Sequence, residues 1–128
     1  MEQNESLEKL KVQDVSKIIE KGNQSLNTGD YPQAIQYFRR AVELMPDNKD
    51  ALICLADFYK RIGEIDRAVE YYEAILHTNP IDFEVYKYLA MLRASSGDYL
   101  KALSDVNMSI LYGGETEDLA LLRANIST

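Results

Sequence analysis

Three stretches of the chain repeat one pattern: TGDYPQAIQYF at 28–38, IGEIDRAVEYY at 62–72 and SGDYLKALSDV at 96–106. Their glycines, Gly29, Gly63 and Gly97, are spaced 34 residues apart, and Pro46 and Pro80 keep the same period. A fixed period of this length is typical of a solenoid, in which one supersecondary unit is repeated and each unit packs on the next. The repeat therefore decides the fold class.

Each repeat is predicted to form two helices. Before each glycine, apolar residues recur at spacings of three and four, as in Leu52, Leu55 and Tyr59, which indicates an amphipathic helix. The glycine suits the left-handed residue that ends a helix, and the acidic residue after it suits the start of the next one. Pro46 and Pro80 end the second helices, because the residue before a proline avoids helical geometry.

These features resemble the tetratricopeptide repeat family. With the glycine at repeat position 15, the family pattern of a small residue at 8, Tyr at 17, Ala at 20 and Pro at 32 is largely met. The small residues at position 8 are Gly22, Ala56 and Ala90. Departures occur at Ser25, Arg93, Val106 and Gly114. The resemblance implies an all-α fold, a right-handed superhelix of stacked antiparallel helix pairs.

The repeat phase divides the chain into five segments. Residues 15–48, 49–82 and 83–116 form three repeats. Residues 1–14 are expected to be an N-terminal helical extension, either an extra turn or a prolongation of the first helix, with a frayed beginning as an alternative. Residues 117–128 are expected to be a capping helix or the start of a further repeat.

The resemblance also implies a binding groove, because the first helices of such repeats line the concave face of the stack. The predicted groove comprises Ile19, Asn23, Leu26, Asn27, Ile53, Asp57, Lys60, Arg61, Glu84, Lys87, Met91 and Leu121. Its apolar members would form a track along the floor, beside charges of both signs. Such a surface suits an extended or helical peptide with a few apolar anchors. The alternative is that these apolar residues only pack between repeats.

The family's carboxylate clamp, which holds the acidic tails of heat-shock chaperones, is not expected here. The five clamp positions hold Ile19, Asn23, Cys54, Glu84 and Tyr88. Only Asn23 matches the clamp pattern, and Glu84 would repel a carboxylate. Without charge-assisted donors, carboxylate recognition loses most of its strength.

Composition excludes several classes of protein. The chain has 128 residues and a net charge of −7, which disfavours nucleic acid or an anionic membrane as partner. One cysteine excludes an internal disulfide, and no signal peptide is recognised, so a cytoplasmic location is expected. No residue pattern suggests a metal site, a cofactor or a catalytic centre, so an enzyme is not expected.

The leading hypothesis is a non-catalytic adaptor or scaffold that binds a peptide or helix of another protein in the groove. One alternative is a small acidic chaperone for secreted proteins, similar in architecture to type III secretion chaperones. The other is self-association, with a homodimer formed through apolar residues of the last segment. The residues proposed for this contact are Leu119, Leu122 and Ile126.

Overall fold

The computed structural model describes residues 2–114 and 116–127, and these residues form seven helices and no strand. In chain order the helices are α1 (Glu2–Asn27), α2 (Tyr31–Leu44), α3 (Lys49–Arg61), α4 (Ile65–Thr78), α5 (Phe83–Ser95), α6 (Tyr99–Leu111) and α7 (Thr116–Ser127). Met1, Glu115 and Thr128, which the predicted segments include, lie outside the described residues.

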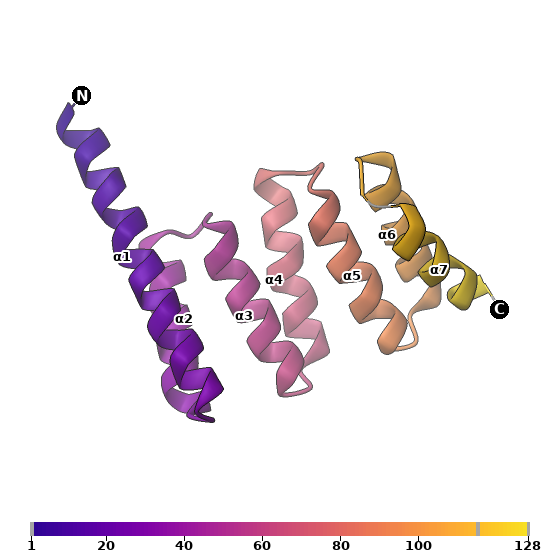
Figure 1. The fold of residues 1–128 in the computed structure, drawn as a ribbon, viewed down its shortest axis with the longest axis horizontal. Helices are drawn as coiled ribbons and strands as arrows, with labels where there is room; N and C mark the ends of the chain where they lie inside the picture. Colours follow the sequence, from indigo (N-terminus) through magenta and orange to yellow (C-terminus); the bar gives the residue numbers. More distant parts are fainter. Residues whose placement is uncertain (1, 115, 128) are drawn as a thin grey trace.

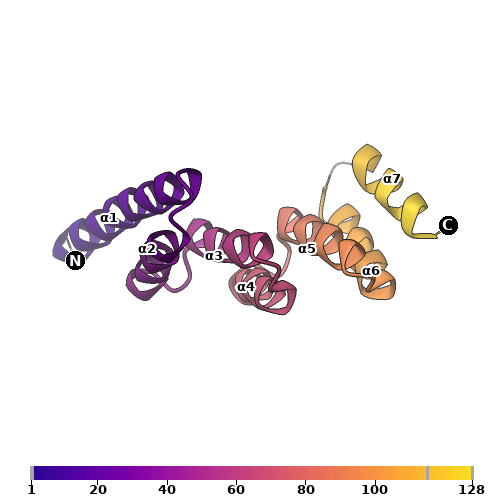
Figure 2. The ribbon, with the colours of Figure 1, turned by 90° about the horizontal axis from the view of Figure 1, so that it is seen from below.

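The helices stack in pairs. α1 packs mainly on α2, α3 on α4 and α5 on α6, and each pair also contacts the next. The odd-numbered helices lie on one side of the stack, and α1 and α7 rise at its two ends (Figures 1 and 2). This arrangement confirms the predicted all-α solenoid. α1 runs without a break from Glu2, so residues 2–14 prolong the first helix.

The turns within the pairs follow the repeat pattern. Gly29, Gly63 and Gly97 have φ between 82° and 88°, a left-handed region that favours glycine over residues with a Cβ. Around the first of them the backbone N–H of Asp30 donates to the carbonyl of Ser25 at 2.8 Å. The Asp30 carboxylate in turn accepts the N–H of Gln33 at 3.2 Å, which caps α2.

Most of the core is continuous through the first five helices. Its fully buried side chains include Phe38 of α2, Leu55 of α3, Ile75 of α4 and Leu89 of α5. Because each helix pair leaves an apolar face uncovered by itself, the neighbouring pair is needed to bury it. One core cluster therefore spans α1 to α5, and smaller clusters lie beside it around Val15 and around Leu119.

A smaller cluster holds the last helix, and it overturns one prediction. Leu119 of α7 is 1% exposed and packs with Ala90 and Val106. The prediction that Leu119 offers an apolar surface to a second copy is wrong, because α7 turns this side chain inward onto α5 and α6. Leu122 and Ile126 are partly buried against the same cluster, and their role in self-association stays a prediction.

Gly22 of α1 lies directly against the Phe38 ring of α2. A Cβ built on Gly22 would lie 2.5 Å from Cε1 and 2.8 Å from Cδ1 of the fully buried Phe38 ring. Real Cβ atoms do not come this close to another heavy atom, so the ring fills the space that a larger residue would need. The small residue at this position is therefore required by packing.

Gly22→Ala is expected to lower the free energy of unfolding by about 1–2 kcal/mol, although alanine is the better helix former. Denaturant unfolding followed by circular dichroism measures this change. The matched comparison is Gly22→Ala in a Phe38→Leu background, where the trimmed side chain leaves room and the added cost should shrink. An equal cost in both backgrounds would show that the ring is not the obstacle.

Candidate functional site

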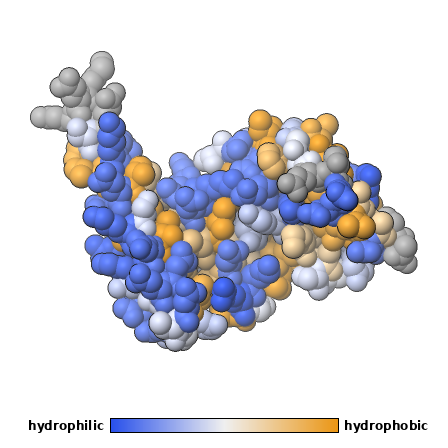
Figure 3. Space-filling model, in the orientation of Figure 1, coloured by the Kyte–Doolittle hydropathy of each residue, from blue (hydrophilic) through white to orange (hydrophobic). Residues whose placement is uncertain are grey.

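A pocket of about 390 Å³ opens between α1 and α3 on the side of the odd-numbered helices. Its lining residues are Asn23, Leu26, Phe38, Cys54, Asp57, Lys60 and Arg61. Leu26 and Phe38 are buried and Cys54 is half-buried, so they form an apolar floor. Figure 3 views this side of the molecule and shows apolar patches among hydrophilic residues. The pocket is thus a small apolar hollow with a polar rim.

The rim carries unneutralised positive charge. Lys60 and Arg61 lie in the last turn of α3, where cations are favoured by the helix dipole. Among the ion pairs of the described residues, none involves either side chain. The one acid of the rim, Asp57, accepts a 2.7 Å hydrogen bond from the Tyr72 hydroxyl of α4. The rim can therefore offer two cationic donors to a ligand that brings its own negative charge.

Five predicted groove residues meet in this pocket, namely Asn23, Leu26, Asp57, Lys60 and Arg61. The predicted apolar track is divided. Ile19 and Ile53 are partly buried against core clusters, whereas Met91 and Leu121 are 48% and 61% exposed. Packing between repeats therefore explains the partial burial of Ile19 and Ile53. None of these four residues lines the pocket.

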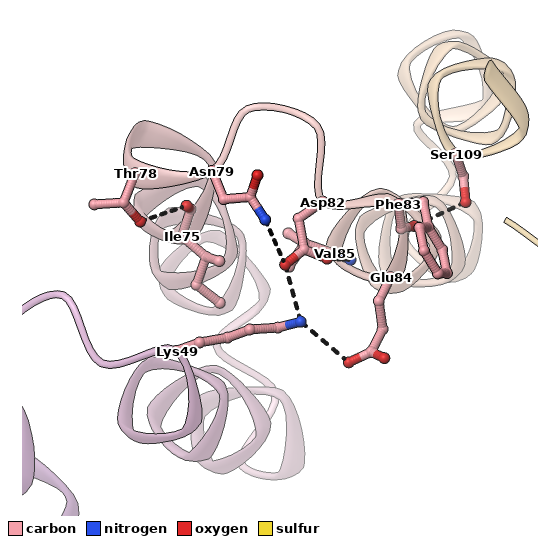
Figure 4. A network of polar contacts seen from close by, with 9 residues as sticks. All are labelled: Lys49, Ile75, Thr78, Asn79, Asp82, Phe83, Glu84, Val85 and Ser109. Atoms are coloured by element: carbon pink, nitrogen blue, oxygen red, sulfur yellow. Dashed lines mark hydrogen bonds and ion pairs between the residues drawn. The ribbon is translucent and has the colours of Figure 1, made fainter. Parts of the chain in front are cut away.

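The remaining predicted groove residues lie outside this hollow. Asn27 is exposed near the end of α1, and Lys87 is half-buried in α5. Glu84 belongs to a network between repeats, in which Lys49 Nζ of α3 lies 2.9 Å from Asp82 and 3.5 Å from Glu84 (Figure 4). The hydrogen bond to Asp82 raises the pKa of Lys49. Glu84 therefore helps to fix α3 against α5.

The sequence prediction missed two floor residues, Phe38 and Cys54. Phe38 belongs to a second helix, and a rule that assigns only first helices to the groove leaves it out. Gly22 is the sequence signal for it, because a residue without a side chain lets the Phe38 ring of α2 pack directly against α1 beside the pocket. Cys54 neighbours the predicted groove residue Ile53 but points between α1 and α3.

Burial raises the pKa of the Cys54 thiol to about 12, and the nearby charges of Asp57 and Asp50 add to this effect. The thiolate is the nucleophilic form of cysteine, so Cys54 is almost wholly protonated and unreactive at neutral pH. It serves the pocket as a small apolar side chain.

Alkylation of Cys54 by iodoacetamide at pH 8 is expected to be at least about a hundredfold slower in the folded chain than in urea, because a pKa near 12 in place of 9.0 leaves about a thousandfold less thiolate. Mass spectrometry over time measures both rates. Equal rates would show that the thiol lies in water and that the apolar floor is absent.

The described residues contain no group of three or more His, Cys, Asp or Glu side chains placed to hold a metal ion. Nor do they contain a helix long and apolar enough to cross a membrane.

The helix pairs, the 34-residue period and the pocket among first helices define a helical-repeat protein. A family model described as tetratricopeptide repeat matches residues 26–95, more than half of the chain. The chain belongs to the tetratricopeptide repeat family. Membership of this family supports a module for protein–protein interaction.

Solved structures share the fold at low sequence identity. The first such domain of Spaghetti (RPAP3), bound to an HSP90 peptide, is 19% identical with a TM-score of 0.77, covering 90% of this chain and 91% of that one. The second domain of human RPAP3, in complex with an HSP70 peptide, is 15% identical with a TM-score of 0.77, covering 92% and 98%. The Sgt2 domain from Aspergillus fumigatus is 21% identical with a TM-score of 0.75, covering 89% and 77%.

Curated relatives match over part of their length. The Photosystem I assembly protein Ycf3 of Prochlorococcus marinus (strain MIT 9215) is 29% identical over 85 residues, which cover 63% of this chain and 49% of that protein. The CTR9 homolog of Arabidopsis thaliana is 26% identical over 103 residues, 79% of this chain and 9% of that protein. The chain thus spans about half the length of the first relative and a small part of the second.

Proposed function

We propose that this chain is an adaptor or assembly factor that holds a segment of a partner protein in the pocket between α1 and α3. The observation that carries the proposal is the combination of an apolar floor with two unpaired cations on the rim. Buried apolar anchors supply most of the binding energy in such contacts, and charges at the rim select and orient the partner.

The pocket suggests the chemistry of the bound segment. A volume of about 390 Å³ suits one medium-sized apolar side chain with some of its backbone, rather than a whole helix face. Lys60 and Arg61 favour an acidic residue beside that anchor, because their charges lack a carboxylate partner among the described ion pairs. The proposed ligand is therefore an extended segment with an apolar residue next to an acidic one.

Binding of heat-shock chaperone tails is not proposed, although two structural neighbours hold such peptides. At the positions where the family's clamp needs donors, Glu84 is engaged with Lys49, and the Tyr88 ring packs against Tyr72 with centroids 5.6 Å apart. Neither side chain supplies a cation to a terminal carboxylate. At this low sequence identity, the similarity to these neighbours supports a shared fold and does not indicate a shared ligand.

A role in assembling a protein complex is supported by the match to a photosystem I assembly protein. Because the match covers 49% of that protein, the likeness extends to the repeat unit and leaves the partner open. The pocket would let the chain hold a partner segment during assembly without chemical change, which agrees with the unreactive thiol at its floor.

Reversing both rim charges, in Lys60→Glu/Arg61→Glu, is expected to weaken binding of a peptide selected from a random library by about a hundredfold or more. Each charge-assisted hydrogen bond lost contributes roughly 1.5–3 kcal/mol, and the new acids repel an acidic residue. Fluorescence polarisation with the labelled peptide measures the dissociation constants.

The matched control is Lys9→Glu/Lys11→Glu, which changes the net charge equally on the exposed beginning of α1, away from the pocket. This control should bind within about threefold of the parent at physiological salt, where distant charges are largely screened. Equal weakening by both double variants would mean that overall charge, and not the pocket, governs binding.

A further inference from the structure

Two arginines from different repeats converge on one tyrosine. Tyr59 of α3 is buried, and its hydroxyl oxygen accepts hydrogen bonds from Arg39 of α2 at 3.1 Å and from Arg67 of α4 at 3.5 Å. The Arg67 guanidinium carbon also lies 5.4 Å from the centroid of the Tyr59 ring, in a cation–π contact. The Tyr71 ring stacks on the Tyr59 ring, with the ring centroids 5.5 Å apart and the ring planes at 3° to each other.

The charges of this group are incompletely balanced. Arg39 has the Tyr59 hydroxyl as its described partner and no carboxylate among the described ion pairs. Arg67 has one carboxylate, Glu64 at 3.2 Å, in an exposed pair within α4. Such exposed pairs contribute about 0–1 kcal/mol and give way easily to a better acceptor. Burial raises the pKa of Tyr59, yet the two guanidiniums outweigh it and the pKa is lowered overall.

The hydrogen-bond donors of this group favour the binding of an anion. A neutral tyrosine that accepts two N–H groups still has its own O–H to donate, and each guanidinium has further N–H groups beyond the one in use. Two cations held close to a neutral oxygen repel each other unless an anion joins them. The group therefore presents at least three donors from three helices around one point.

The surface beside this group is hollowed on both sides. Arg39 lines one shallow hollow of about 450 Å³ with Gln36, Arg40, Glu43 and Leu44. Arg67 lines another of about 390 Å³ formed by the turn at Gly63. Neither arginine nor Tyr59 lines the pocket between α1 and α3. This second site is therefore independent of the proposed peptide pocket.

We propose that Arg39, Arg67 and the Tyr59 hydroxyl form a binding site for a phosphate group where the arginines of α2 and α4 meet the tyrosine of α3. A phosphate monoester offers three acceptor oxygens in a tetrahedral arrangement, which suits donors that arrive from three helices better than the two oxygens of a carboxylate do. The phosphate is either free in solution or carried on a phosphorylated side chain of a partner protein.

The test uses the full chain and two probes, inorganic phosphate and the blocked tripeptide Gly-phosphoserine-Gly, at constant ionic strength. Nitrogen-15 NMR of the arginine side chains follows the Nε–H signals during titration. Saturable shifts of Arg39 and Arg67 are expected, with dissociation constants of about 1 mM or lower. Tighter binding of the tripeptide would identify a partner-borne phosphate, and equal binding would identify the free ion; both support the site.

Arg39→Gln and Arg67→Gln should each weaken the binding of phosphate by about tenfold or more, because each removes a charge-assisted hydrogen bond. Lys101→Gln is the matched control, since it removes one positive charge from the exposed start of α6, which contacts α5 and α7 and not the helices of this site. Tyr59→Phe keeps the ring and should weaken binding several-fold even if an arginine variant unfolds. Absence of saturation up to about 10 mM, or equal weakening by Lys101→Gln, would overturn the proposal.

Discussion

Arg93→Met is expected to lower the free energy of unfolding at pH 7 by about 3 kcal/mol. Arg93 of α5 lies 2.7 Å from Asp105 of α6 and 2.6 Å from Glu73 of α4, so it joins three helices of two repeats. The Asp105 side chain is 8% exposed and that of Arg93 15%. Removing the guanidinium would leave the Asp105 carboxylate buried without its counter-charge. This uncompensated charge would destabilise the folded chain.

The pH dependence of this variant follows from Asp105. Burial raises the pKa of Asp105, Arg93 opposes this effect, and the pKa remains above the usual 3.8. A carboxyl with a raised pKa binds its proton more tightly when folded, so its stabilising effect is present at low pH and is lost as the pH rises through that pKa. Without Arg93 the pKa rises further, and the cost of Arg93→Met should shrink as the pH falls from 7 towards 4.

Arg93→Met/Asp105→Asn is the matched control, because the asparagine amide cannot ionise. Urea unfolding at several pH values should show a smaller loss of unfolding free energy for this double variant. That loss should no longer depend on pH, because residue 105 then carries no titrating group. A cost for Arg93→Met that is the same at all pH values would contradict the ion pair, since lost packing of a long side chain does not titrate.

Leu119→Asp is expected to detach α7 from the stack. Leu119 is the fully buried anchor of this helix on Ala90 and Val106, and a carboxylate placed there would cost more than about 3 kcal/mol. α7 contacts α5 and α6, so the loss should stay local, as expected for repeats that interact with their neighbours. A detached helix of 12 residues is only marginally stable in water.

Hydrogen exchange measures this result directly. Amide protection in α7 should be lost while protection in α3 and α4 remains. Leu121→Asp is the matched control, because Leu121 lies two residues away and is 61% exposed, so its amide protection should match the parent. Equal exchange in both variants would show that Leu119 does not anchor the helix.

The fold could be predicted from the sequence because its determinants are local. Gly63 and Pro80 end helices through their backbone geometry, and Gly22 allows α1 and α2 to pack closely. Because these residues act locally, the 34-residue period in the sequence is enough to predict the architecture. The departures from the family pattern could not be interpreted in the same way. Arg93, which stands where an aromatic residue is usual, belongs to an ion-pair network whose partners come from other helices.

Gly114 is a second departure with a structural reason. A Cβ on Gly114 would lie 2.5 Å from the Oγ of Ser109, which donates at 2.8 Å to the carbonyl of Phe83. A Cβ on Gly114 would also lie 2.9 Å from Cδ1 of Leu119, so the glycine leaves room for this leucine to pack inward. Repeat phase alone does not contain this information.

The predicted groove residues coincide with the pocket lining in part, and their binding of a partner stays a prediction. Position in the repeat placed Lys60 and Arg61 at the pocket, because both follow directly from the phase of α3. It could not tell how deeply Ile19 or Ile53 is packed, since that depends on the side chains of the neighbouring helices. It also could not find Phe38, which reaches the pocket floor from α2.

A partner segment is proposed to bind in the pocket between α1 and α3. The most direct measurement is two-dimensional NMR of the labelled chain, titrated with a peptide selected from a random library. Binding in this pocket is expected to shift the backbone signals of the residues that line it, namely Asn23, Leu26, Cys54, Asp57 and Arg61. Shifts confined to α2, α4 and α6, with this pocket unperturbed, would contradict it.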